Sequence, residues 1–206
     1  ALESHLKASK AIEKGEFKDE IIPVNDISED GCVRPDTTLE SMSQLKPAFD
    51  KEGVVTAGTS SPLTDGAAAV IVCSEDYAKS NRLKMLAYIR GMAISGCSPE
   101  IMGIGPVVSS QKALKRAGLK LEDIDIIEMN EAFAAQSLAC VDELGIDMSK
   151  LNIHGGALAM GHPLGASGAR ITGKAASLLQ NNGVKYALST MCVGGGQGCA
   201  TILERA

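Results

Sequence analysis

Apolar runs that alternate with helix-like segments are the feature that most constrains the fold of this chain. The run from Ala67 to Cys73 is continuous and lies between turn residues, which is typical of a strand buried on both faces. Further strands are expected at 86–94, 124–129, 151–153, 185–193 and 198–203, and helices at 74–82, 106–117, 131–144 and 165–180. The alternation predicts an α/β fold, a three-layer αβα sandwich in which the five strands from residue 86 onward form a mixed five-stranded sheet that ends in a hairpin.

The first 53 residues follow a different pattern. Residues 1–16 have helical periodicity, whereas 20–52 are irregular because several prolines and an Asp-Gly pair interrupt them. The segment Thr37-Thr-Leu-Glu40 resembles a capping box and predicts a short helix that extends toward Leu45. We therefore expect a loop-rich appendage over 1–53 ahead of the sandwich.

Charge, aromatic content and cysteine spacing exclude several classes of function. With a formal net charge of −5, no Trp, three Tyr and three Phe, the chain offers neither a basic surface nor stacking platforms for nucleic acid. No signal-peptide pattern and no run of about 18 apolar residues occurs, so no membrane span is expected. The six cysteines include no C-x-x-C pair and lie mostly in apolar runs, which favours free thiols and a reducing, cytoplasmic location.

Two motifs that bind ligands in other proteins are incomplete here. Residues 168–174 fit a phosphate loop until Ala175, where magnesium binding needs Ser or Thr, and they fall within a predicted helix. The three histidines, His5, His154 and His162, form no pair at four-residue spacing and have no adjacent carboxylate motif. Neither a nucleotide site nor a metal site is expected, and His154 is interpreted as structural.

Glycines surround one cysteine and one histidine near the end of the chain. Cys192 precedes three consecutive glycines, and His162 lies between Gly161 and Gly165, followed by Pro163. Burial statistics alone favour a core cysteine, and a histidine before proline is more often structural or solvated. The glycines favour a site instead, because they let backbone and ligand approach closely. We interpret Cys192 and His162 as a proton-transfer site.

Three ordered motifs resemble those of the thiolases, which are acyl-CoA C-acyltransferases. They are NEAFAAQ at 130–136, GGALAMGHPLGASGAR at 155–170 and MCVGGGQG at 191–198. The similarity extends over nearly all 206 residues, including 56–61, 65–69 and 97–106. The resemblance implies that 1–53 is part of the thiolase loop domain, that 54–82 is the final strand and helix of the N-terminal half, and that 83–206 is the C-terminal domain.

The resemblance also indicates what the chain lacks. In the family a second, nucleophilic cysteine lies in an N-terminal half that precedes the matched region. None of Cys32, Cys73, Cys97 or Cys140 stands in such a motif. We therefore expect this chain to be the C-terminal portion of a thiolase, without the nucleophile.

The resemblance implies four catalytic residues for the thiolytic cleavage of a 3-ketoacyl-CoA. In this reaction a thiolate adds to the ketone, the C–C bond breaks, and the departing thioester enolate must be protonated at carbon. Cys192 matches the family residue that moves this proton, for which a thiol with a pKa of about 8.5 is suited. His162 matches the histidine that activates the nucleophilic cysteine and donates toward a thioester oxygen.

The other two matched residues belong to oxyanion holes. Asn130 matches the asparagine that holds a water, and this water and His162 form one oxyanion hole. Taken alone, Asn130 also suits a helix N-cap, and the two roles are compatible. Gly194 matches the glycine whose N–H contributes to the second oxyanion hole.

Substrate contacts implied by the resemblance are less specific. Met102 and Gly105 match a loop that lines the acyl pocket, and Ser61 matches a position that contacts the pantetheine arm. Single Met and Ser residues also serve packing and loops. Lys18 and Arg34 are candidates to approach the CoA phosphates, although nothing local selects them. Coenzyme A enters as a substrate, with acyl-CoA, and no separate cofactor is expected.

Two activities within the family and two other classes stay open at this point. Degradative 3-ketoacyl-CoA thiolases serve fatty-acid β-oxidation, and biosynthetic acetyl-CoA acetyltransferases condense two acetyl units. The segment Arg34-Pro-Asp-Thr-Thr38 favours the bacterial fatty-acid-oxidation type. A non-catalytic thiolase half would only bind CoA or a partner subunit. A papain-like cysteine hydrolase shares Cys, His and Asn, but here their order is Asn130, His162, Cys192 and no protease motif surrounds the cysteine.

Assembly and packing follow from the same resemblance. The parent enzyme is expected to be a homodimer or homotetramer, with a fatty-acid-oxidation subunit as a candidate partner. Cys192 and His162 are expected to project from the same edge of the sheet. The helix at 165–180 is expected to meet another helix or chain through its small residues, Ala166, Ala169, Gly173 and Ala176. Residues 1 to about 80 are expected to be less ordered than the rest or paired with another molecule.

Overall fold

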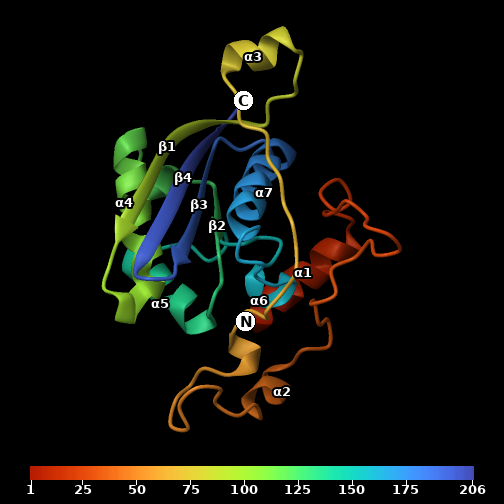
Figure 1. The fold of residues 1–206 in the computed structure, drawn as a ribbon, viewed down its shortest axis with the longest axis vertical. Helices are drawn as coiled ribbons and strands as arrows, with labels where there is room; N and C mark the ends of the chain where they lie inside the picture. Colours follow the sequence, from red (N-terminus) through yellow and green to blue (C-terminus); the bar gives the residue numbers. More distant parts are fainter.

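A mixed four-stranded sheet forms the centre of the computed structural model, which describes all residues from 1 to 206 (Figure 1). The strands are β1 (Ala87–Gly96), β2 (Ile126–Met129), β3 (Tyr186–Val193) and β4 (Gln197–Arg205). They lie in the order β1-β4-β3-β2; β2 and β3 run parallel, whereas the other neighbours run antiparallel. β3 and β4 form the expected hairpin at the end of the chain.

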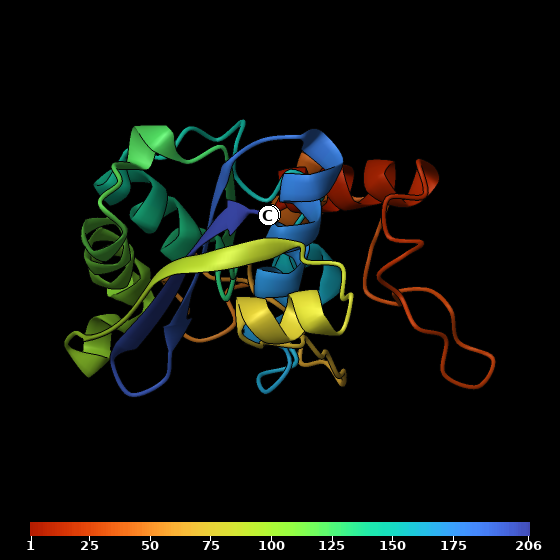
Figure 2. The same ribbon diagram turned by 90° about the horizontal axis from the view of Figure 1, so that it is seen from above.

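Helices cover both faces of the sheet, which confirms the αβα sandwich (Figure 2). α4 (Gly105–Ala117) and α5 (Ala134–Leu144) pack on one face, over a buried cluster that includes Ile127, Leu188 and Ile202. α7 (Ser167–Asn182) packs on the other face through Leu178 and Leu179. Full burial of an aliphatic side chain of this size stabilises the fold by roughly 1.5–3 kcal/mol. The sheet is therefore the rigid support on which the loops at its edges are built.

The fifth strand expected at 151–153 is not formed. Leu151 makes only an isolated parallel bridge with Ile127 of β2. The chain turns away at Asn152, which adopts a positive φ of 43°. Its side chain then replaces the next strand residue: Oδ1 accepts from the Met129 N–H at 2.8 Å, and Nδ2 donates to the Met129 carbonyl at 2.9 Å. A side-chain amide thus satisfies the edge of β2, where a strand was expected.

The remaining helices lie outside the two layers that cover the sheet. They are α1 (Leu2–Glu13), α2 (Leu39–Ser43), α3 (Glu75–Ser80), α6 (Ala157–Met160) and the 3-10 helices Ala57–Thr59, Pro99–Ile104 and Leu121–Asp123. The capping box of α2 is formed by Thr38 and Ser41, one residue later than the sequence pattern indicated. No helix combines the length and the apolar character that a membrane crossing requires.

The appendage is attached to the sandwich through α1 and through the loop that follows it. α1 packs against α6, and Phe17 joins the buried cluster between them. Lys174 of α7 is only 5% exposed; its ammonium lies 2.9 Å from the Glu20 carboxylate and 4.3 Å from the centroid of the Phe17 ring. Beyond these contacts, the segment between α1 and α2 has no helix or strand, as expected for a loop-rich region.

The run from Ala67 to Cys73 is not a strand in this chain, contrary to the sequence prediction. All seven residues are exposed, and none takes part in a backbone–backbone hydrogen bond. The segment passes α7 on its way to α3 (Figure 1). A strand forms only when a neighbouring strand binds its N–H and C=O groups, and no such neighbour is present in this chain.

The small-residue face of α7 meets this extended segment rather than a helix. A Cβ on Gly173 would lie 3.1 Å from Val70 Cγ1. Ala166 is buried, whereas Ala169, Gly173 and Ala176 are half-buried. The main neighbours of α7 are β2, β3 and β4. The expected packing of α7 against another helix is therefore not formed within this chain.

Candidate active site

The loop that carries His162 is fixed by a second loop. Gly161 has a φ of 91°, which favours glycine, and a Cβ there would lie 2.3 Å from Thr64 Oγ1. Thr64 Oγ1 accepts a hydrogen bond from the His162 N–H at 3.1 Å and donates to the Pro62 carbonyl at 2.6 Å. Glycine at 161 is thus what allows Thr64 to hold the backbone of the histidine.

The imidazole of His162 makes two hydrogen bonds that agree on one tautomer. Nδ1 lies 2.6 Å from Ser167 Oγ, and Nε2 lies 3.2 Å from Asn130 Nδ2. Ser167 Oγ donates its single hydrogen to the Pro163 carbonyl at 3.1 Å, so it accepts from Nδ1–H of the ring. Nε2 then carries a lone pair that accepts from the Asn130 amide. In this tautomer Nε2 is the atom that takes up a proton.

The surroundings of His162 keep the ring neutral. The imidazole is half-buried, and this burial lowers its pKa, with the positive charge of Arg170 as a second cause in the same direction. A lowered pKa means that the neutral form persists to lower pH than in an exposed histidine. The ring is therefore available as a base at neutral pH.

Asn130 connects this histidine to the sheet. It follows β2 directly and is fully buried, and its N–H donates to the Thr190 carbonyl of β3 at 3.0 Å. α5 begins only at Ala134, with Phe133 at the N-cap, so Asn130 does not cap that helix. The Oδ1 atom of Asn130 is buried and has no hydrogen-bond partner. Because an unsatisfied buried acceptor is costly, this atom marks a place where a water or ligand binds favourably.

Cys192 lies near the end of β3, opposite Gly198 of β4 and two residues beyond Thr190, which binds Asn130. The residue is 4% exposed, and burial raises the pKa of its thiol to about 11, with the neighbouring Cys140 thiol as a second cause. The thiol therefore keeps its proton at neutral pH, unlike the nearly unperturbed thiol that the sequence suggested. Such a group is suited to give a proton to a carbanion.

Gly194 begins the turn of the β3–β4 hairpin. A Cβ on Gly196 would lie 2.3 Å from the Cys97 carbonyl oxygen, so close backbone packing explains glycine at that position. A Cβ on Gly194 would meet no atom within 4 Å. Packing inside the chain therefore does not explain glycine at 194, and the backbone there borders open space.

The three expected substrate contacts lie in two segments, since Met102 and Gly105 are close in the sequence and Ser61 is not. Ser61 binds the loop that follows Asn130, because its N–H and its hydroxyl donate to the Ala132 carbonyl at 3.0 and 3.1 Å. Met102 is half-buried within the 3-10 helix Pro99–Ile104. Gly105 is buried, and a Cβ there would lie 2.3 Å from the Gln197 carbonyl oxygen, so this glycine is required for close packing against the hairpin.

Several side chains that support the site carried no recognisable signal in the sequence. They are Thr64, Asn152, Ser167 and Glu131. Thr64 acts on His162 across 98 residues of chain, and no local pattern connects the two. Glu131 and Ser167 lie inside the two motifs that mark Asn130 and His162, which is the only indication that they belong to the site.

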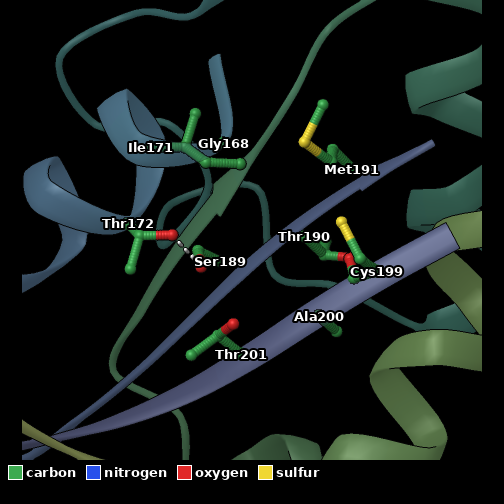
Figure 3. Close-up of a pocket in the computed structure, with 9 residues that line it drawn as sticks. All are labelled: Gly168, Ile171, Thr172, Ser189, Thr190, Met191, Cys199, Ala200 and Thr201. Atoms are coloured by element: carbon green, nitrogen blue, oxygen red, sulfur yellow. Dashed lines mark hydrogen bonds between the residues drawn. The ribbon is translucent and has the colours of Figure 1, made fainter. Parts of the chain in front are cut away.

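A cavity of about 30 Å³ lies between α7 and the sheet, next to Met191 (Figure 3). Thr172 of α7 and Ser189 of β3 form a hydrogen bond of 3.1 Å across its wall. A space of this size holds about one water molecule, so it is a packing gap and not a substrate pocket. No three His, Cys, Asp or Glu side chains are grouped to hold a metal ion.

Comparison with known families agrees with the fold. The sequence model of the thiolase C-terminal domain matches residues 83–205, and that of the thiolase N-terminal domain matches residues 1–76. The chain therefore belongs to the thiolase family, which confirms the resemblance of the three motifs.

Similar proteins include 3-ketoacyl-CoA thiolases from Vibrio parahaemolyticus and Marinobacter nauticus. The Vibrio protein is 52% identical over 100% of this chain and 56% of its own length. The Marinobacter protein is 52% identical over 98% of this chain and 55% of its own length. The crystal structure of human mitochondrial 3-ketoacyl-CoA thiolase in complex with CoA has a TM-score of 0.96 and 48% identity, over 100% of this chain and 53% of that one. The crystal structure of acetyl-CoA acetyltransferase from Bacillus anthracis has a TM-score of 0.94 and 43% identity, over 100% of this chain and 54% of that one. The chain spans about half the length of the relatives that it matches.

Thiol labelling tests the burial of Cys192. In the 206-residue chain, we expect iodoacetamide to modify the exposed Cys73 at neutral pH much faster than Cys192. The reactive species is the thiolate, and the raised pKa of Cys192 means that its thiolate forms only as the pH approaches about 11. Mass spectrometry of peptides gives both rates, with circular dichroism as the control for folding at each pH. Equal rates at neutral pH in folded protein contradict the prediction.

Proposed function

We propose that the protein to which this chain belongs cleaves 3-ketoacyl-CoA with CoA, giving acetyl-CoA and a shortened acyl-CoA, as in fatty-acid β-oxidation. The observation that carries the proposal is the hydrogen bond between Asn130 and Nε2 of His162, beside the strand that holds Cys192. This hydrogen bond joins one residue of the motif at 130–136 to one of the motif at 155–170. Asn130 also binds Thr190, the residue directly before the third motif at 191–198. The similar proteins named 3-ketoacyl-CoA thiolase support the same activity.

In the proposed reaction, Nε2 of His162 removes the proton of a nucleophilic cysteine that the N-terminal half supplies. The thiolate attacks the C3 ketone, and the C2–C3 bond breaks with its electron pair passing to the thioester enolate. Cys192 gives its proton to C2, which releases acetyl-CoA. The thiol of CoA then loses its proton to Cys192 and attacks the acyl thioester, which yields the shortened acyl-CoA; the nucleophilic cysteine leaves as a thiolate and recovers its proton from His162.

Two oxyanion sites complete the proposal. The unpartnered Oδ1 of Asn130 accepts a hydrogen from a water, whose other hydrogen points to the thioester oxygen beside the protonated His162. The open space at Gly194 lets its N–H contribute to the second site. Ser61, Met102 and Gly105 stay proposed substrate contacts. Coenzyme A serves as substrate, and we propose no separate cofactor.

The alternative activity is the condensation of two acetyl units. The similarity to Bacillus anthracis acetyl-CoA acetyltransferase supports it, since that protein shares the fold at 43% identity. A thiolysis assay of the full-length protein with acetoacetyl-CoA and 3-ketodecanoyl-CoA separates the two. We expect kcat/KM for the longer substrate to be at least about tenfold higher, because each methylene bound in an apolar pocket contributes a factor of this order. A preference for acetoacetyl-CoA indicates the biosynthetic type, and inactivity toward both indicates a non-catalytic binding module.

Assembly and location enter the proposal through the resemblance alone. We infer a homodimer or homotetramer of the full-length protein in the cytoplasm, with a fatty-acid-oxidation subunit as candidate partner. All six cysteines are free, which is compatible with a reducing compartment. Analytical ultracentrifugation of the full-length protein, alone and with that subunit, tests the assembly.

A further inference from the structure

We propose that Glu131 is a positioning residue that fixes the positions of Asn130 and His162 relative to each other. The inference rests on the proposed function, because it assigns Glu131 to the same reaction. Glu131 directly follows Asn130 and is 8% exposed. Its carboxylate accepts hydrogen bonds from three separate segments: Ser4 Oγ at 2.7 Å, Asn152 Nδ2 at 2.7 Å and the Leu158 N–H at 3.1 Å.

On the His162 side, Glu131 caps the N-terminus of α6, although it is distant from this helix in the sequence. The N-cap of α6 is Gly156, which has no side chain to satisfy the first amides of the helix. The Leu158 N–H donates directly to Oε2 of Glu131, and the Gly156 N–H donates at 2.9 Å to Ser4 Oγ, which donates to the same oxygen. One carboxylate thus replaces the missing local cap.

The fit around this cap is close. A Cβ on Gly156 would lie 2.4 Å from Cδ of Glu131, so the carboxylate occupies the space that a side chain at 156 would need. α6 ends at Met160, and His162 follows after Gly161. A displacement of α6 therefore moves the histidine.

On the Asn130 side, Glu131 acts through Asn152. Nδ2 of Asn152 donates to Oε1 of Glu131 and to the Met129 carbonyl, while its Oδ1 accepts from the Met129 N–H. The residue before Asn130 and the residue after it are therefore bound to the same amide. The position of Asn130 depends on this contact as well as on its own bond to Thr190.

The three partners of Glu131 all donate, which suits a carboxylate and does not suit an amide. In Glu131→Gln the NH2 group replaces one oxygen and faces a donor in either orientation, so at least one of the three bonds is lost. The volume of the side chain is preserved. The variant therefore disturbs the network without opening a cavity.

A double-mutant cycle in the full-length enzyme tests the proposal. We expect Glu131→Gln to lower kcat about ten- to hundredfold with KM changed less than about twofold, because a displaced catalytic group costs rate more than binding. In the Asn130→Ala background, the same change is expected to cost little more, since both act through one pair. The exposed Glu122→Gln is the matched control for loss of a carboxylate and should leave kcat unchanged.

Either of two results overturns the inference, and a third overturns the proposed function on which it rests. Losses that multiply in the double variant, or a kcat of Glu131→Gln equal to that of the wild type, show that Glu131 does not act through Asn130. If Glu131→Gln fails to fold, Ser4→Ala removes one link of the network from the buried face of α1, and its kcat must fall several-fold and non-additively with Asn130→Ala. If Asn130→Ala and His162→Ala both keep full thiolysis, the proposed function itself is wrong.

Discussion

The 206-residue chain alone is expected to show no thiolysis of acetoacetyl-CoA. Thiolysis needs a cysteine that becomes acylated, and in the proposed reaction this nucleophile belongs to the N-terminal half. Cys192 cannot replace it, because its raised pKa of about 11 leaves almost no thiolate at neutral pH. Loss of acetoacetyl-CoA enolate absorbance after addition of CoA measures the reaction.

The full-length enzyme under the same conditions is the positive control, and intact mass verifies the short chain. The decisive opposite result is measurable thiolysis by the 206-residue preparation that disappears in Cys192→Ser. That outcome makes Cys192 the nucleophile and removes the need for a second cysteine. Thiolysis that survives Cys192→Ser points to another cysteine of this chain or to a contaminating thiolase, which activity in a mock purification identifies.

The elements of the sandwich that local patterns encode could be predicted from the sequence. The strands expected at 185–193 and 198–203 are observed as Tyr186–Val193 and Gln197–Arg205. These strands have apolar residues at both faces and glycines at the turn between them, so their signal is local. The helix expected at 106–117 also begins within one residue of its place, at Gly105.

The two predicted strands that are not formed, at 151–153 and 67–73, depend on partners that the local sequence does not describe. At 151–153, the amide of Asn152 binds β2 and the chain turns away after Leu151. At 67–73, the composition of a buried strand is present, but no neighbouring strand of this chain binds it. Apolar composition reports the tendency to be buried, whereas pairing is a tertiary property.

The candidate site also combines features that the local sequence predicts with features that depend on the folded structure. The motifs predict that Asn130, His162 and Cys192 take part in one reaction, and this stays a prediction. Which nitrogen of His162 carries the proton is set by Ser167 and Asn130, and the pKa of Cys192 is set by its burial in the folded sheet. These properties arise from contacts that form only in the folded chain, so residue types and spacing alone do not contain them.

In the full-length enzyme, Cys192→Ser is expected to lower kcat by a factor of about 10² to 10⁴, the range that a positioned proton donor contributes. A serine hydroxyl keeps nearly the same shape but is a far weaker acid than a thiol, so it neither protonates the C2 carbanion nor recovers the proton from CoA. KM should change little, because the side chain is buried and its size is almost preserved.

Exchange of the C2 hydrogens of acetyl-CoA with deuterated water isolates this step, and mass spectrometry measures it. We expect the exchange to be lost in Cys192→Ser, while acylation of the enzyme by a thioester, which depends on His162 and the nucleophile, continues. Cys199→Ser is the matched control, since this half-buried cysteine lies on the adjacent strand opposite Met191 and has no proposed role. Exchange at the wild-type rate in Cys192→Ser assigns the C2 proton to another group, and the candidate is then His162, whose Nε2 already carries the acceptor lone pair.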